Sequence, residues 1–431
     1  MTVITRLLKK NIFKDFLSVS FIQGLNYLVP LLLMPYVVRR LGPEYFGLAS
    51  FSQSFVLYFT LIVNYGFDLS ATREVAKATG NVKRQGQIFN EILQVKTFLF
   101  VISSILFLIV MALTPKLKEH AQLHIVSYLI NIGAVLFPMW FFQGINQLKM
   151  ATIFNFSAKV LMALLVILFV HNASDYVNYN GALSLAQILL GISSFIYVYK
   201  KYTIKLYWIG WLKIRVILKQ GFSLFLSMIV INFYTTTNIV LLGFLSNNTA
   251  TGYFAGTAKV IAVVMTVMLM PLSYILYPKI AHTLHHDKEA GIELLQKTIW
   301  IAFGIGLIMS LGVLIFSKWI IIILFGQSFL PAQTTLIIMS ALPFLIALSN
   351  AFGIQGMLNF KMDKAFLKIT SLGAILCVVV NLFVIPIYNQ NGAAFAWLFT
   401  ECFITGAAIF YIKKVLPTIF DFKILKNLIH V

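Results

Sequence analysis

The chain has 431 residues, of which 60% are hydrophobic and only 11% are charged, and its mean hydropathy is +0.90. A soluble domain carries roughly 25% charged residues, so this composition excludes a water-soluble globule. The formal net charge of +20 does not indicate a nucleic-acid partner, because the basic residues gather in short connections between apolar segments, as they do in membrane proteins.

Twelve apolar segments follow one another along the chain, each about long enough to cross a bilayer as a helix. They lie near 16–38, 46–68, 90–113, 122–145, 153–171, 181–199, 222–245, 252–277, 298–324, 333–354, 364–385 and 392–412. Because lipid offers no partners to backbone polar groups, we expect an all-α polytopic membrane protein of about twelve transmembrane helices.

Lys and Arg residues are distributed unequally between the two sets of connections. The N-terminus, the even-to-odd connections and the C-terminus hold 25 of them, and the opposite set holds five. The positive-inside rule therefore predicts that both termini of this multi-pass protein are cytoplasmic. The basic, amphipathic connections at 200–220 and 278–297 are expected to lie along the anionic inner leaflet.

Short sequence matches recur between the two halves of the chain, at offsets within a few residues of each other. The clearest is Gln143-Gly144 followed by Lys149-Met150, which recurs as Gln355-Gly356 followed by Lys361-Met362. We therefore expect two pseudo-symmetric six-helix bundles around a central cavity, the arrangement of alternating-access transporters. The predicted lobes are 1–199 and 221–431, the second with a short cytoplasmic tail, joined by an amphipathic cytoplasmic linker at 200–220.

Four cations at or within predicted spans are candidates for contact with an anionic substrate, because a charge at membrane depth normally faces a bundle interior or a wet cavity. They are Arg39, Arg40, Lys159 and Lys259. Arg suits bidentate phosphate contacts and Lys a point-charge contact. The alternative is that Lys159 and Lys96 extend to the inner interface and the arginines to the outer one, whereas Lys259 is several residues from either end of its span.

Acidic residues suggest two further roles. Glu401, in the middle of the last span, is either a protonatable coupling group or the charge partner of a cavity cation. Asp68, Arg73 and Glu74, at the inner end of the second span, form either an interfacial charge network or a gate. No metal site is expected, because the cluster around His285 has no second group of ligands.

Several motifs resemble those of the O-antigen flippases of the polysaccharide transport family, and the resemblance covers essentially the whole chain. The motifs are the stretches at 24–30, 35–47, 64–72, 138–144, 277–280, 342–350 and 400–402. The family belongs to the superfamily of multidrug, oligosaccharidyl-lipid and polysaccharide exporters. The resemblance implies two lobes around a charged cavity and movement of undecaprenyl-pyrophosphate-linked oligosaccharide from the cytoplasmic to the periplasmic face.

The same resemblance implies no bound cofactor, coupling to a proton or sodium gradient, and membrane lipid as a partner, with the polymerase and chain-length regulator of the same pathway as further partners. An ion-coupled exporter of drugs or small molecules is the nearest alternative, although its cavity should be acidic. A membrane-embedded polymerase should carry a large external loop, and the outward connections here are short. We therefore predict a transporter and not an enzyme.

Overall fold

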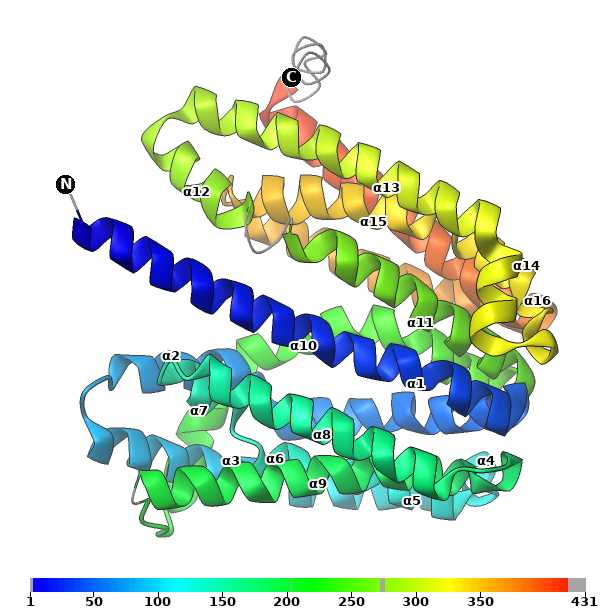
Figure 1. The fold of residues 1–431 in the computed structure, drawn as a ribbon, viewed down its shortest axis with the longest axis horizontal. Coiled ribbons are helices and arrows are strands. Elements are labelled where there is room, and N and C mark those ends of the chain that lie inside the picture. The colour runs from blue at the N-terminus through cyan, green and yellow to red at the C-terminus, as the bar shows by residue number, and fades with distance from the viewer. Residues whose placement is uncertain (1–2, 203, 272–275, 418–431) are drawn as a thin grey trace. The chain divides into compact units, whose positions relative to one another are not determined.

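A computed structural model describes residues 3–202, 204–271 and 276–417, and all regular structure within them is helical (Figure 1). The elements are α1 (Val3–Asn64), α2 (Phe67–Lys77), α3 (Val82–Leu113), α4 (Pro115–Lys118), α5 (Ala121–Tyr128), α6 (Ile130–Leu136), α7 (Met139–Gly144), α8 (Leu148–Phe169), η1 (Ala173–Asp175), α9 (Tyr176–Lys201), α10 (Trp211–Leu245), α11 (Asn248–Pro271), α12 (Tyr277–His286), α13 (Lys288–Phe325), η3 (Gln327–Phe329), α14 (Ala332–Met339), α15 (Leu342–Ser349), η4 (Asn350–Leu358) and α16 (Asp363–Val415). The predicted tail beyond residue 417 lies outside the described residues.

The predicted number of spans agrees with the helices. Among the described residues, eight helical stretches are long and apolar enough to cross a membrane, and two of them, Val29–Lys77 and Asp363–Val415, are 49 and 53 residues long. One crossing needs about 20 residues, so each of these two accommodates two crossings. With α10 and α11, of 35 and 24 residues, the helices accommodate twelve crossings, which confirms the predicted all-α polytopic fold.

The two longest helices each contain a break in the backbone between two predicted spans. α1 breaks at Gly42, whose φ of 69° and ψ of 173° favour a residue without Cβ. α16 breaks at Asn389, with φ of 49° and ψ of −128°. Asn tolerates positive φ better than most residues. The polar sequence around each position therefore marks where one crossing ends and the next begins.

The chain divides into two compact units. The first comprises Met1–Leu41 and Phe51–Ile229, and the second comprises Gly42–Ser50 and Val230–Val431. The connection predicted at 200–220 belongs to the first unit, and its second half is already helical, because α10 begins at Trp211.

Two predicted spans, 122–145 and 333–354, were expected to be continuous helices, but each is divided into shorter ones. The first is divided into α5, α6 and α7, and the second into α14, α15 and η4. Pro138 lacks an N–H and forces the preceding Phe137 into an extended conformation with ψ of 111°, which ends α6. Pro343 lies in the first turn of α15, where a missing N–H is tolerated.

The duplication is also visible in the backbone turns that follow these broken spans. Asn146 and Lys361, 215 residues apart, have left-handed φ angles of 57° and 58°. In each turn the next residue donates its N–H to the carbonyl five residues earlier, Gln147 to Phe142 at 2.8 Å and Met362 to Met357 at 2.9 Å. The same helix-ending turn therefore occurs at corresponding places in both halves.

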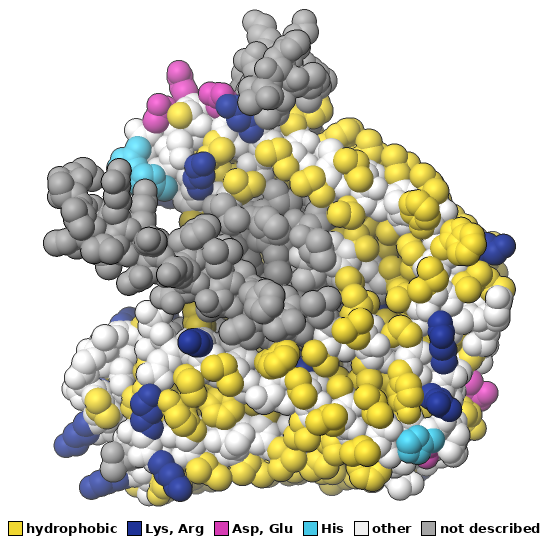
Figure 2. All heavy atoms as spheres, viewed as in Figure 1, with side chains coloured by type: hydrophobic (Ala, Val, Ile, Leu, Met, Phe, Trp, Pro, Cys, Tyr) yellow, Lys and Arg dark blue, Asp and Glu magenta, His cyan; other side chains and the backbone are white. Residues whose placement is uncertain are grey.

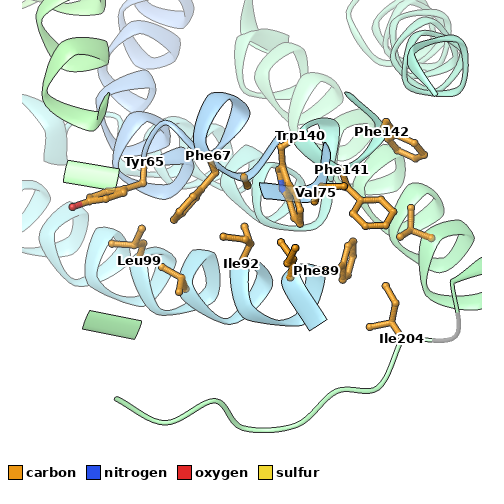
Figure 3. Close-up of a cluster of buried hydrophobic side chains, with 14 of the residues drawn as sticks. Tyr65, Phe67, Val75, Phe89, Ile92, Leu99, Trp140, Phe141, Phe142 and Ile204 are labelled. Carbon is orange, nitrogen blue, oxygen red and sulfur yellow. The ribbon is translucent and has the colours of Figure 1, made fainter. Parts of the chain in front are cut away.

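Aromatic packing joins α2, α3 and α7 within the first unit (Figure 3). Phe67, Ala71 and Val75, four residues apart along α2, form its buried face. They belong to the same cluster as the fully buried Phe141 and Phe142 of α7. Elsewhere the helices expose apolar side chains to the surroundings. On the face shown in Figure 2, Lys and Arg lie mainly toward the left and right edges.

α6 and α9 approach closely at Gly133. A Cβ added there would lie 2.3 Å from the carbonyl oxygen of Gln187, and one added at Gly191 would lie 2.9 Å from that of Gly133. Small residues allow backbones to approach in this way in membrane helices. The contact fixes α6 against α9, and both helices contribute to the polar cavity described below.

We predict that Gly133→Ala lowers the stability of the protein in detergent by about 1–3 kcal/mol, because the added methyl meets backbone atoms that cannot rotate away. Gly304→Ala on α13 is the matched control, since a Cβ there meets nothing within 4 Å. Thermal unfolding checks the prediction, and equal melting temperatures for the two variants would contradict it.

Candidate functional site

A polar cavity of about 390 Å³ lies within the first unit. Its walls come from α1, α2, α3, α6, α7, α8 and α9 together with the α6–α7 connection. The polar side chains that line it are Thr60, Asn64, Asp68, Lys96, Asn155 and Gln187. Burying so many polar groups on membrane helices costs free energy. Such groups are typical of a site that binds an ion, a charged substrate or water.

Lys96 is the most buried charged group of this cavity. Its side chain, on α3, is 2% exposed, and its ammonium group donates a hydrogen bond to the Ala134 carbonyl at 2.5 Å. The charge of Asp68 acts on it, but no ion pair within the described part of the chain includes Lys96. The sequence reasoning allowed Lys96 to extend to the interface, whereas the structure turns it inward.

Asp68, Arg73 and Glu74 are divided between two environments. Arg73 and Glu74 are exposed, with Nε and Oε1 3.9 Å apart, and Lys77 Nζ lies 2.9 Å from the same carboxylate oxygen. Pairs of this kind contribute little to stability. Asp68, one turn earlier on α2, lines the polar cavity instead. The structure therefore separates Asp68 from the surface charges with which it was grouped.

Two predicted cavity cations of the first unit, Arg39 and Arg40, are exposed at the break in α1. Arg40 donates from Nη1 to the His171 carbonyl at 3.2 Å, and its guanidinium lies 5.5 Å from the centre of the Tyr36 ring. Lys159, on α8, is half-buried and is not among the residues that line the polar cavity. The structure thus does not bring these three cations together in one site.

Lys259 belongs to the second unit, on α11, and is half-buried. Its ammonium group lies 4.7 Å from the centre of the Phe46 ring, within the range of a cation–π interaction. Phe46 is fully buried and makes an edge-to-face contact with Phe329. No described carboxylate lies within ion-pair distance of Lys259, so an aromatic face positions this cation.

Glu401, on α16, is 3% exposed and lies beside a buried polar cluster of the second unit. Within that cluster, Asn381 Nδ2 donates to Asn238 Oδ1 and to the Cys377 carbonyl, both at 2.7 Å. Glu401 interacts electrostatically with the Cys377 thiol. None of the ion pairs among the described residues includes Glu401.

Comparison with known proteins identifies the family. A model of the family described as "Polysaccharide biosynthesis protein" matches residues 12–284. A protein of Escherichia coli K12 named "Putative O-antigen transporter" is 32% identical over 94% of this chain and 98% of its own length. The chain belongs to this polysaccharide biosynthesis family. A protein of the same name from Shigella dysenteriae is 27% identical over 95% of this chain and its entire length.

Solved structures agree on the fold at low sequence identity. The lipid II flippase MurJ in an inward closed conformation is 13% identical, with a TM-score of 0.71 over 92% of this chain and 87% of MurJ. A multidrug resistance transporter of the MATE family in an inward-facing conformation is 14% identical, with a TM-score of 0.67 over 91% of this chain and 95% of its own. The family member described here therefore shares its fold with these two transport proteins.

Lys96→Met separates a structural from a functional role for the buried cation. We expect an unchanged or higher melting temperature, because an apolar side chain of similar length replaces a desolvated charge that has no carboxylate bonded to it. Transport should fall at least tenfold, since a hydrogen bond to a charged group contributes about 1.5–3 kcal/mol.

Leu99→Met, a volume-conserving change at another buried position of α3, is the control and should alter neither quantity. Thermal unfolding and surface polysaccharide are measured on the same strains. Loss of stability together with transport in Lys96→Met would assign Lys96 to the fold.

Proposed function

We propose that this chain is a flippase that moves an undecaprenyl-pyrophosphate-linked oligosaccharide, the repeat unit of O-antigen or a similar surface polysaccharide, across the bacterial inner membrane. The observation that carries the proposal is the relationship over essentially the full length to proteins named as O-antigen transporters. The proposed direction, from the cytoplasmic to the periplasmic face, is the one that the family resemblance implies. The proposal that both termini are cytoplasmic rests on the distribution of Lys and Arg.

The physical difficulty of this reaction is the passage of a charged head group through lipid. Lys96 in the first unit and Lys259 in the second are cations at membrane depth that no described carboxylate neutralises by a direct ion pair. A diphosphate group is a suitable partner for such cations, because its charge replaces the solvation they lack.

Alternating access of the two lobes requires no covalent chemistry. In this mechanism the head group binds to the inward-open state, the lobes rock, and the apolar tail stays in the bilayer while the head crosses. The protein would then need no bound cofactor and would act as a transporter and not as an enzyme. The translocated repeat unit would then pass to the polymerase and chain-length regulator of the same pathway.

Coupling to an ion gradient is assigned to Glu401. Its side chain is buried beside the cluster of Asn238, Cys377 and Asn381, and the absence of an ion pair at Glu401 among the described residues favours a titratable role over simple charge pairing. A carboxyl group in this setting can exchange a proton or hold a sodium ion together with neighbouring amide oxygens.

Lys259→Glu tests the substrate site. In a deletion strain complemented with this variant, we expect loss of long-chain surface polysaccharide and accumulation of lipid-linked single repeat units on the cytoplasmic side, since reversed charge repels the diphosphate. Lys288→Glu, an exposed cation at the start of α13, should complement fully. Membrane levels of both variants are compared by immunoblotting.

The deletion strain itself decides between this function and drug export. Normal polymer accompanied by altered drug sensitivity would refute flipping and indicate an exporter. Full complementation by Lys259→Glu at wild-type abundance would exclude that residue from the mechanism without affecting the rest of the proposal.

Glu401→Gln tests the coupling group in proteoliposomes that contain the lipid-linked repeat unit. We expect wild-type flipping to accelerate with an imposed proton or sodium gradient and the variant to lose that response, because the amide can neither ionise nor balance a cation. Glu289→Gln, at an exposed position of α13, is the control and should respond as the wild type does. An unaltered gradient response in Glu401→Gln would contradict the assignment.

A further inference from the structure

A groove of about 1030 Å³ lies along the beginning of α10, within the first unit. Its α10 wall is formed mainly by Trp211, Arg215, Leu218, Lys219 and Phe222. Trp211, Arg215, Leu218 and Phe222 follow one another at intervals of four, three and four, and Lys219 lies four residues after Arg215, so these residues form one stripe of the helix. The stripe combines two cations, one turn apart, with two large aromatic side chains.

The opposite wall comes from Phe98 of α3 and from Tyr65, which directly follows α1. The Phe98 ring meets the Trp211 ring edge to face, with centroids 5.3 Å apart. The Tyr65 hydroxyl donates to the Leu218 carbonyl at 3.1 Å, and its ring stacks on that of Phe225 at 4.4 Å. The groove is therefore fixed on both sides, yet Trp211 remains 63% exposed and Phe222 54% exposed.

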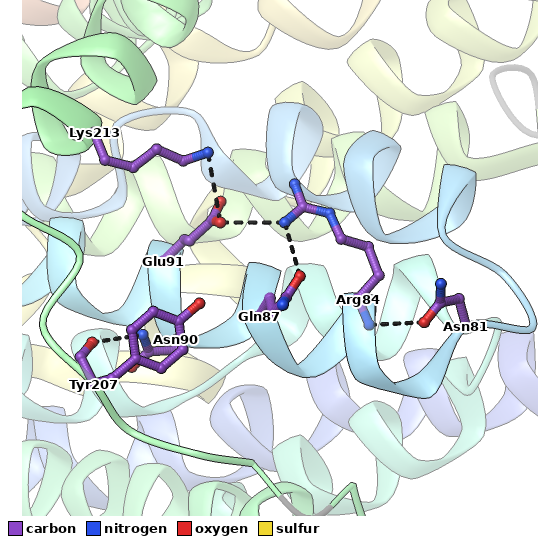
Figure 4. A network of polar contacts seen from close by, with 7 residues as sticks. All are labelled: Asn81, Arg84, Gln87, Asn90, Glu91, Tyr207 and Lys213. Carbon is purple, nitrogen blue, oxygen red and sulfur yellow. Dashed lines mark hydrogen bonds and ion pairs between the residues drawn. The ribbon is translucent and has the colours of Figure 1, made fainter.

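The connection that leads into α10 is fastened to α3 (Figure 4). Asn90 Nδ2 donates to the Tyr207 carbonyl at 2.8 Å, and the Ile209 N–H donates to Gln94 Oε1 at 3.2 Å. Lys213 lies 3.5 Å from the Glu91 carboxylate, which also pairs with Arg84 at 3.2 Å. These bonds hold the start of α10 in place.

The cations at the beginning of α10 differ in whether an acidic side chain pairs with them. Glu91 neutralises Lys213, whereas no described carboxylate lies within ion-pair distance of Arg215 or Lys219. Two uncompensated cations thus flank an apolar, aromatic groove at the basic end of the first unit. A ligand that matches this surface must carry an anionic group attached to an apolar chain.

We propose that this groove is a binding site for an anionic phospholipid of the bilayer, with the phosphate held between Arg215 and Lys219 and an acyl chain along Trp211, Phe98 and Phe222. Basic pockets beside membrane helices bind anionic head groups, and Trp and Tyr favour the head-group level. Arg adds paired hydrogen bonds to phosphate oxygens.

The geometry favours a resident lipid over the transported one. Every wall of the groove belongs to the first unit, and the connection at its entrance is fastened to α3, so movement between lobes need not open or close it. A substrate must leave its site in each cycle, whereas a resident lipid can remain and anchor the beginning of α10 at the inner leaflet.

Thermal unfolding of the full-length protein, titrated with phosphatidylglycerol or phosphatidylcholine in mixed micelles, tests the proposal. Arg215→Gln/Lys219→Gln is compared with Lys200→Gln/Lys205→Gln, which removes two exposed cations that do not line the groove. For the first variant we expect half-maximal stabilisation to need about thirtyfold more phosphatidylglycerol, the effect of losing two cations near an anionic surface. The control variant should resemble the wild type, and phosphatidylcholine should stabilise none of them.

Equal responses of the two double variants would overturn the site, because the effect would then be non-specific attraction. Stabilisation by undecaprenyl diphosphate but not by phosphatidylglycerol, lost in Arg215→Gln/Lys219→Gln, would assign the groove to the carrier lipid and refute the proposal. If that variant does not fold, quenching of tryptophan fluorescence is measured instead. Phosphatidylglycerol brominated on its acyl chain should quench the fluorescence of the wild type more than that of Trp211→Phe. Equal quenching would overturn the site.

Discussion

Lipid provides no hydrogen-bond partner, and this constraint determines where every polar side chain of the described helices can lie. Lys96 reaches the backbone carbonyl of Ala134, which is available because α6 is a short helix that ends two residues later. In the second unit, Asn381 bonds to Asn238 and to a backbone carbonyl of its own helix. The break after α6 therefore supplies a partner for Lys96 that a continuous helix would withhold, whereas Asn381 finds its partners on α10 and within α16.

Most of the fold could be predicted from the sequence, because the apolar segments have the length that a bilayer requires and short matches recur in the same order in the two halves. Kinks at Pro138 and Pro343 are expected from the sequence, but the division of 122–145 and 333–354 into separate helices was not predicted. Kinking prolines are common in membrane helices, and the sequence alone does not distinguish a kink from a division into separate helices.

The candidate site was harder to predict from the sequence. Lys96 was recognised as a charge in a span, but whether a lysine extends to the interface or turns inward depends on the neighbouring helix, here α6 held against α9 at Gly133. Polar residues in neighbouring spans, such as Asn155 and Gln187, were the available signal of a shared cavity. Arg39, Arg40, Lys159 and Lys259 were grouped by charge alone, and the structure distributes them among separate environments.

The paired turns at Asn146 and Lys361 have a consequence for how the duplication is recognised. The recurring letters place Lys361 opposite Lys149, whereas the backbone places it opposite Asn146, three positions away. The two halves thus share a backbone conformation at two positions that the recurring residues do not align. A search for internal symmetry in such chains therefore gains from aligning helix ends as well as amino acids.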